Sequence, residues 1–219
     1  GDTVNTNSAY LGRELAALGI NCYYQTVVGD NPQRLKDMLE LALSRSDIVI
    51  TTGGLGPTYD DLTKETVAEY FGREMVLHEQ SYEMVAEIFR KSGRKMTDNN
   101  RKQALMPKDA VVFNNDRGTA NGLAVEGDGK TVIMLPGPPR EMTAMFQNEV
   151  KPYLSKFSEK YLVSRNIHIF GIGESTIENE LHDYMLSMSN PTIAPYAKEG
   201  GVVLRVTAGA DSRQQAQEM

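Results

Sequence analysis

The fold is decided by residues 47–63, which read D-I-V-I-T-T-G-G-L-G-P-T-Y-D-D-L-T. The run Ile48–Ile50 is apolar on both faces, which is typical of a central parallel strand covered by helices on each side. The strand breaks into a loop with three glycines, and a helix is predicted to begin directly after the loop, near Leu62. This strand–loop–helix unit indicates an α/β fold.

The flanking segments repeat the alternation of strands and helices. A second apolar run, 131–135, ends in a turn with three prolines and is followed by another predicted helix. We therefore expect residues 1–157 to form a doubly wound, mostly parallel, three-layer sheet. The patterns predict helices at 8–18, 32–43 (with Asn31 as N-cap and Pro32 as first residue), 62–71, 81–92 and 141–157, and strands at 22–28, 48–50, 111–113, 122–125 and 131–135.

The pattern changes after Ser158. Residues 161–170 have strand periodicity, a glycine-containing turn leads into a helix near 175–185, and 202–208 alternate again. We expect a second, smaller α+β domain at 158–219, with the break near Phe157.

Composition excludes several classes of protein. The formal net charge of −6 argues against a general binder of nucleic-acid backbones, which needs clustered positive charge. No apolar run approaches the roughly 18 residues of a membrane span. The single cysteine, Cys22, can form neither an internal disulfide nor a cysteine-based zinc site, so we expect a reducing, cytoplasmic compartment. The lack of a membrane-spanning run predicts that the protein has no membrane partner.

The glycine loop is the strongest candidate site. Gly53, Gly54 and Gly56 let backbone N–H groups approach a ligand closely, and the following helix directs its positive N-terminal end at the same crevice. Taken alone, this pattern indicates a phosphate- or nucleotide-binding loop. Asp60 and Asp61 would repel an anion unless a divalent cation such as magnesium lay between them. The alternative is that one aspartate only caps the helix.

Three further regions could line the same edge of the sheet. In 135–142, the turn offers Gly137 for close approach and Arg140 for a phosphate or carboxylate. Segments 5–8 and 29–31 are explained almost as well by helix capping as by ligand contact. Asp30 is the better candidate for ligand contact, because Asn31 already serves as the helix cap. Segments 98–103 and 118–122 are by default solvated surface, with ligand contact as the alternative.

The motifs in these regions resemble one family. Residues 52–63 are similar to the molybdopterin-binding superfamily, and 29–31, 99–104, 118–122 and 135–142 resemble its competence/damage-inducible branch, CinA. Residues 170–175 and 191–197 match that family's small KH-like domain. The resemblance covers essentially the whole chain in co-linear order.

The resemblance implies a nucleotide pyrophosphatase. Members of this branch are described as hydrolysing ADP-ribose, to AMP and ribose 5-phosphate, with a divalent metal (magnesium, cobalt or manganese), which links them to pyridine-nucleotide recycling. By position, Asp60 or Asp61 would hold the metal and act in catalysis. The remaining ligand-binding positions would be a phosphate cradle of Gly53, Gly54, Gly56 and Thr58, a pocket lining of Asp30, Asn100, Gln103 and Asn121, and a wall of Pro136, Gly137 and Arg140.

The sequence departs from the family's pattern at both ends. The family begins with a further strand and a Gly-Thr-Glu loop ahead of Gly1, so we expect a sheet that lacks one strand. The family also continues into an amidase domain, so we expect a KH-like domain cut at its C-terminus and no amidase activity. We expect a homodimer that binds a small nucleotide and no nucleic acid. The rivals are a pterin-phosphate or nucleotide binder without hydrolysis, and a structural or regulatory protein with a vestigial pocket.

Overall fold

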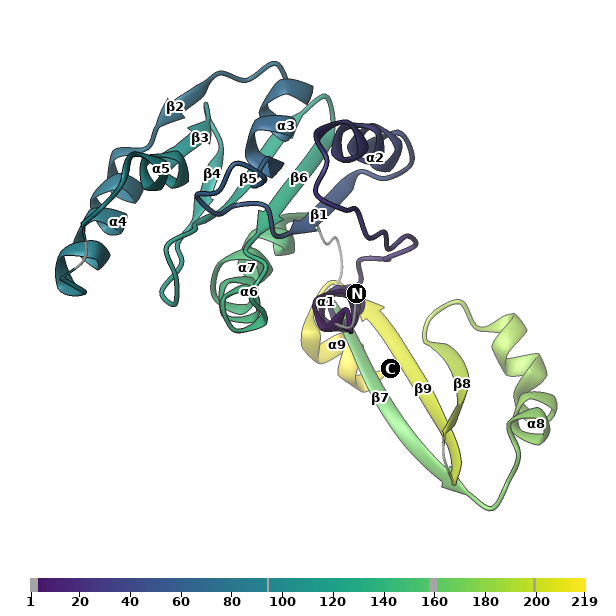
Figure 1. The fold of residues 1–219 in the computed structure, drawn as a ribbon. Coiled ribbons are helices and arrows are strands. Elements are labelled where there is room, and N and C mark those ends of the chain that lie inside the picture. Colours follow the sequence, from purple (N-terminus) through teal and green to yellow (C-terminus); the bar gives the residue numbers. More distant parts are fainter. Residues whose placement is uncertain (1–3, 94, 158–160, 199) are drawn as a thin grey trace. The chain divides into compact units, whose positions relative to one another are not determined.

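The computed structural model describes residues 4–93, 95–157, 161–198 and 200–219 (Figure 1). The chain divides into two compact units. The larger unit comprises 1–10 and 24–153, and the smaller unit comprises 11–23 and 154–219. The predicted boundary near Phe157 borders residues 158–160, which lie outside the described residues, and it stays a prediction.

The larger unit is built on a four-stranded sheet of order β1-β6-β5-β4 (Figure 1). β1 and β6 pair in parallel, whereas β6–β5 and β5–β4 pair antiparallel, so the α/β class is confirmed but the described strands are not mostly parallel. The reason is a tight turn at Asp128-Gly129, whose φ angles of 51° and 74° join β5 to β6 as a hairpin. The four strands are β1 (Ile48–Thr52), β4 (Val111–Phe113), β5 (Gly122–Gly127) and β6 (Lys130–Leu135).

Helices cover this sheet. Leu39 and Leu43 of α2 pack with Val67 of α3 against alternate residues of β5 and β6, and the residues between them, such as Ile133, are buried on the opposite face. The predicted N-cap is confirmed, since Asn31 Oδ1 accepts from the Arg34 N–H at 3.0 Å. The helical elements up to residue 157 are α1 (Thr6–Ala17), α2 (Pro32–Arg45), α3 (Thr63–Tyr70), α4 (Glu79–Lys91), α5 (Asp98–Arg101), η1 (Lys102–Ala104), α6 (Pro139–Met145), η2 (Phe146–Val150), α7 (Lys151–Leu154) and η3 (Ser155–Phe157). Of these, residues 11–17 of α1, Leu154 of α7 and all of η3 belong to the smaller unit.

Two short strands that the sequence patterns did not predict connect distant parts of the larger unit. β2 (Met75–Leu77) and β3 (Leu105–Pro107) pair antiparallel beside the main sheet. β3 directly follows α5 and η1, and it packs against α3. This pairing therefore brings residues 98–105 close to the helix that begins after the glycine loop.

The predicted strand at 22–28 is wrong. No described residue of this segment lies in a strand, and Tyr23 and Val27 are exposed. The apolar and polar residues do alternate, but a strand requires hydrogen bonds to a neighbouring strand, and none of the described strands pairs with this segment.

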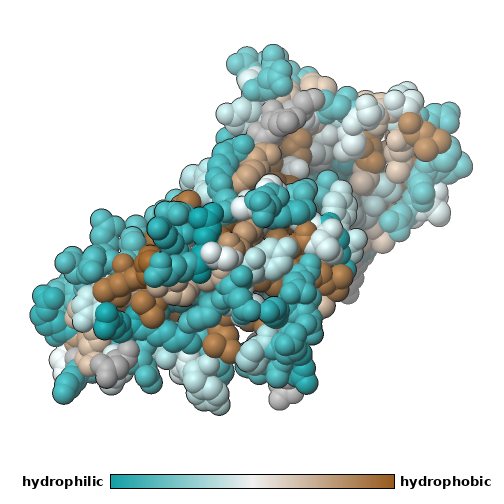
Figure 2. All heavy atoms as spheres, turned by 90° about the horizontal axis from the view of Figure 1, so that it is seen from above, coloured by the Kyte–Doolittle hydropathy of each residue, from teal (hydrophilic) through white to brown (hydrophobic). Residues whose placement is uncertain are grey.

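The smaller unit contains a three-stranded antiparallel sheet of order β7-β9-β8. Ile177 of α8 packs against Val202 and Leu204 of β9, and this cluster is the core of the predicted α+β domain. Figure 2 draws the whole chain and shows one face, on which hydrophilic residues predominate and hydrophobic residues form small separate groups. No described helix is both long enough and apolar enough to span a bilayer. The elements are β7 (Tyr161–Phe170), α8 (Glu174–Ser187), β8 (Thr192–Lys198), β9 (Gly201–Ala210) and α9 (Arg213–Glu218).

Candidate functional site

Two loops touch at the carboxyl ends of the parallel strands. Thr52 and Leu135 lie opposite each other in the register, and the Gly53 N–H donates to the Leu135 carbonyl at 2.9 Å. A Cβ on Gly137 would lie 3.4 Å from the Gly53 Cα, at the short end of ordinary van der Waals contact, so the two backbones approach each other closely. Asn7 Nδ2 donates to the Gly137 carbonyl at 2.8 Å. The glycine loop and the proline turn therefore form one edge of the sheet, where ligands bind in α/β folds.

The start of the glycine loop is tied to the first turn of α3. Gly53 and Gly54 have φ angles of 98° and 70°, which side chains rarely adopt. A Cβ on Gly54 would lie 2.1 Å from Thr63 Oγ1. That hydroxyl donates to the Gly53 carbonyl at 3.0 Å, and the Thr63 N–H donates to the Gly54 carbonyl at 3.2 Å. Only glycine fits this tight connection.

Asp61 braces the loop. Its Oδ2 accepts hydrogen bonds from the Thr58 N–H, at 3.0 Å, and from the Thr58 hydroxyl. Burial raises the pKa of Asp61, but the hydrogen bonds from Thr58 and from the Gly56 backbone outweigh it and hold the pKa below its usual range. A Cβ on Gly56 would lie 2.5 Å from the same oxygen. The helix N-cap is Leu62, which makes no side-chain cap, so the Asp61 carboxylate stabilises the loop rather than the helix end.

Asp60 differs from its neighbour. Its carboxylate is exposed and has no hydrogen-bond or ion-pair partner in the described parts of the chain. Among those residues, no three acidic, histidine or cysteine side chains gather into a metal-binding group. Magnesium is often held by one or two carboxylates together with substrate phosphates, so Asp60 is the described residue that could contribute a ligand to a cation shared with a bound phosphate.

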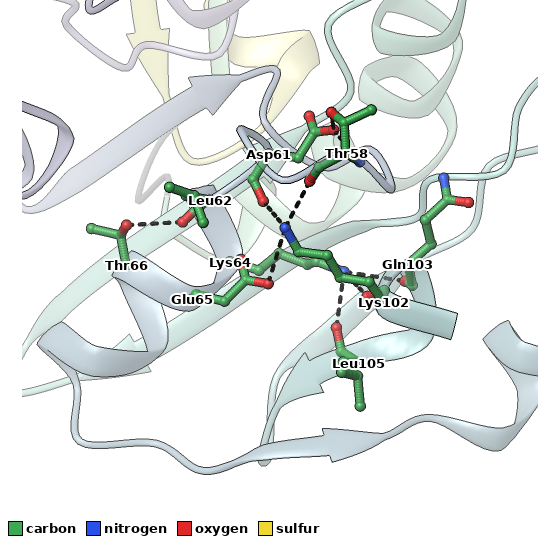
Figure 3. Close-up of polar contacts among 9 residues, drawn as sticks. All are labelled: Thr58, Asp61, Leu62, Lys64, Glu65, Thr66, Lys102, Gln103 and Leu105. Atoms are coloured by element: carbon green, nitrogen blue, oxygen red, sulfur yellow. Dashed lines mark hydrogen bonds and ion pairs between the residues drawn. The ribbon is translucent and has the colours of Figure 1, made fainter. Parts of the chain in front are cut away.

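Two lysines hold the loop and residues 98–105 together (Figure 3). Lys64 of α3 is 1% exposed, and its Nζ donates to the carbonyls of Lys102, Gln103 and Leu105 at 2.9, 3.2 and 2.9 Å. Burial lowers the pKa of Lys64 to about 8. Lys102 Nζ reaches back to the carbonyls of Thr58, at 3.0 Å, and Asp61, and lies 3.6 Å from Glu65 Oε1. We call Lys64 and Lys102 together the lysine clasp.

An open pocket of about 300 Å³ lies where the loop meets this segment. Arg101 lies on its wall with an exposed guanidinium that has no partner among the described residues, whereas the Lys102 ammonium is occupied in the clasp. Of the predicted site residues, Thr58 is the one that lines this pocket. The lining residues are Pro57, Thr58, Tyr59, Asn99, Arg101, Lys102 and Leu105.

Three amides that we expected to line a pocket make internal hydrogen bonds instead. Asn100 Oδ1 accepts from the Thr97 N–H and hydroxyl, at 3.0 and 2.8 Å, in a capping box at the start of α5. Gln103 Nε2 donates to Thr119 Oγ1 at 2.8 Å, and its Oε1 is buried without a partner. Asn121 bridges the Asn115 N–H and the Ser81 hydroxyl, at 2.9 and 2.8 Å. Their roles toward a ligand stay predictions.

The other predicted positions lie outside the open pocket. Pro136 is buried beside Gly137 at the loop contact, while Arg140 and Asp30 are exposed. The structure adds Tyr59, Arg101 and the lysine clasp to the candidate site. The sequence contains a signal for Arg101 and Lys102, two adjacent cations in a polar helix start, but we interpreted that segment as solvated surface by default. Nothing in the sequence pattern marks Lys64 as buried, because it sits in an ordinary polar position of a predicted helix.

Comparisons with known proteins identify the family of this chain. Residues 1–156 match the family described as a probable molybdopterin binding domain, and residues 164–219 match the damage-inducible protein CinA KH domain. A CinA-like protein of Dictyoglomus thermophilum is 53% identical over 219 residues, which is all of this chain and 53% of that protein. The chain spans about half the length of the curated relatives it matches.

A solved structure also places this chain among CinA proteins. The crystal structure of a CinA protein of unknown function from Thermoplasma acidophilum is similar with a TM-score of 0.61 and 37% identity, over 68% of this chain and 88% of that one. The resemblance expected from the motifs is thus confirmed at the level of the family. The chain belongs to the CinA family, with a molybdopterin-binding-type domain followed by a CinA KH domain.

Proposed function

We propose that the larger unit binds a small phosphorylated ligand of the nucleotide or pterin type in the pocket between the glycine loop and residues 99–105. The observation that carries this proposal is the placement of Arg101, an exposed residue that lines the same pocket as Thr58. A guanidinium matches the geometry of phosphate oxygens and can bind two of them at once. The membership of residues 1–156 in a molybdopterin-binding family agrees with a ligand of this class.

The residues around Arg101 would preorganise the site. Asp61 and the lysine clasp fix the loop tip before a ligand arrives, so little ordering has to be done on binding. The Thr58 hydroxyl donates to Asp61, and its lone pairs stay available to accept a hydrogen bond from a ligand hydroxyl or water. An acidic protein with a net charge of −6 can then bind a phosphate, because the local positive charge of Arg101 attracts it.

Hydrolysis of ADP-ribose to AMP and ribose 5-phosphate is a second candidate, favoured by the exposed and unpaired carboxylate of Asp60. Asp60 would hold a divalent cation together with the ligand phosphates, and such an ion neutralises phosphate charge and lowers the pKa of a bound water. In this reaction one water is added across the pyrophosphate, so that one phosphorus gains the water oxygen and the other keeps the bridging oxygen. Arg101 would bind the ligand phosphate both in binding without hydrolysis and in hydrolysis.

Calorimetric titration with ADP-ribose and with pyrophosphate, each with and without magnesium, tests the proposal. Wild-type protein should bind both ligands, and Arg101→Ala should weaken both about tenfold or more, which is the scale of one charge-assisted hydrogen-bonded pair. Lys36→Ala, which removes a partly exposed lysine on α2, is the control. Chromatography of the same mixtures with magnesium, cobalt or manganese measures AMP release. Binding without AMP release supports the binding function alone, and absence of binding contradicts both candidates.

A further inference from the structure

The side chain at the tip of the glycine loop is an exposed aromatic ring. Tyr59 is 91% exposed and has no hydrogen-bond or ring partner in the described parts of the chain. Its neighbours are held in place, because Thr58 is bonded to Asp61 and the Asp61 N–H donates to the Thr58 carbonyl at 3.3 Å. A flat apolar surface is therefore presented to solvent on a fixed backbone.

Exposure alone does not distinguish this ring, since Tyr23 is 77% exposed as well. Tyr59 differs because it lines the pocket that also contains the unpaired Arg101 guanidinium. Two further walls of that pocket, Pro57 and Leu105, are apolar. The pocket thus combines an aromatic face, an apolar lining and one available cation, and its volume of about 300 Å³ lies at the lower end of the range for small-molecule sites.

We propose that Tyr59 and Arg101 together select ligands in which a planar heteroaromatic ring is joined to a phosphate, with the ring stacked on Tyr59 and the phosphate bound by Arg101. This inference rests on the proposed phosphate-binding function and adds to it a residue, Tyr59, that selects for the ring of the ligand. A phosphate alone would use only Arg101, whereas a phosphorylated nucleoside or pterin would use both side chains. Stacking on an aromatic side chain tolerates different rings, because every base has a π-face.

The test compares two ligands that share a phosphorylated ribose and differ in the ring, AMP and ribose 5-phosphate. Each is titrated into the full chain and its variants by calorimetry. Wild type should bind AMP more tightly, and Tyr59→Ala should lower the affinity for AMP about tenfold, the effect of one base–aromatic stack, while changing that for ribose 5-phosphate less than about twofold. Tyr59→Phe keeps the ring and should retain AMP affinity. Tyr23→Ala should change neither ligand, and Arg101→Ala should weaken both.

The outcomes separate this inference from the function on which it rests. If the wild type binds both ligands but Tyr59→Ala leaves AMP affinity unchanged, or weakens both ligands equally, the stacking role is wrong while the phosphate site stands. If the wild type binds neither ligand, the proposed function fails and the inference fails with it. Because Tyr59 is almost fully exposed, its replacement should leave the thermal unfolding of the protein unchanged, which a parallel melting curve checks.

Discussion

Replacing the buried lysine of the clasp, Lys64→Met, should destabilise the larger unit by about 3 kcal/mol. Methionine keeps the length of the side chain but removes the ammonium that bonds three carbonyls. Each such bond to a charged donor contributes roughly 1.5 kcal/mol or more. The Lys102 carbonyl keeps one partner, the Leu105 N–H, so two carbonyls lose their donor and the sum is about 3 kcal/mol.

The assay is thermal and urea-induced unfolding of the full chain, followed by circular dichroism. A change of this size corresponds to a Tm lower by roughly 6–12 °C in a chain of this length. Lys36→Met is the matched control, because Lys36 is a partly exposed lysine with one surface ion pair, to Glu69 at 2.7 Å, and such pairs contribute less than about 1 kcal/mol. A loss for Lys64→Met no larger than that of the control would refute the structural role of the clasp.

The remaining predictions concern the loop and its pH dependence. Asp61→Asn should lower the free energy of unfolding by about 1–2 kcal/mol, because the loop loses a charged acceptor, whereas Asp60→Asn should stay within about 0.5 kcal/mol and should instead abolish any gain in ADP-ribose affinity from magnesium. Equal losses in the two variants on urea unfolding would contradict the assignment. Gly56→Ala should cost about 1–2 kcal/mol, since its Cβ would lie 2.5 Å from Asp61 Oδ2, while Gly29→Ala, with its nearest atom at 3.8 Å, should have little effect in the same assay. The unfolded chain binds more protons than the folded one between the folded pKa of Lys64, about 8, and its usual value near 10.4, so the stability of wild type relative to Lys64→Met should rise with pH across that window. A difference that falls or stays flat from pH 8 to 10.5 in urea titrations would show that Lys64 is not buried as described.

The sequence predicted the elements whose signals are local. The strand at 48–50, the cap at Asn31 with Pro32 behind it, and the strand of residues 131–135 each depend on a few neighbouring residues, and all three are confirmed. The central position expected for the first of these strands is wrong for the described sheet, because β1 lies at its edge with β6 as its described neighbour and its residues are only partly buried. The strand predicted at 22–28 failed because alternation describes only one chain, while strand formation depends on a pairing partner elsewhere. The Asp128-Gly129 hairpin did carry a local signal, and it explains why the sheet contains antiparallel pairs.

The candidate site was predictable only in part, for the same reason. The contact between Gly53 and Gly137 follows from two parallel strands ending at one edge. The amides of Asn100, Gln103 and Asn121 could not be assigned from sequence, because their partners lie in a helix cap, a separate loop and α4, respectively. The clasp between α3 and η1 depends on the β2–β3 pairing, which joins segments about 30 residues apart and leaves no trace in the local pattern.

The most direct test of the account is the location of the ligand on the protein. Titration of isotope-labelled full chain with ADP-ribose, followed by amide NMR, reports which backbone groups sense the ligand. The account predicts the largest shifts at Thr58, Tyr59 and Arg101, with smaller ones along residues 102–105. Shifts confined to Asp30 or Arg140, or no shifts at saturating ADP-ribose, would contradict the claim that the pocket between the glycine loop and residues 99–105 binds a phosphorylated ligand.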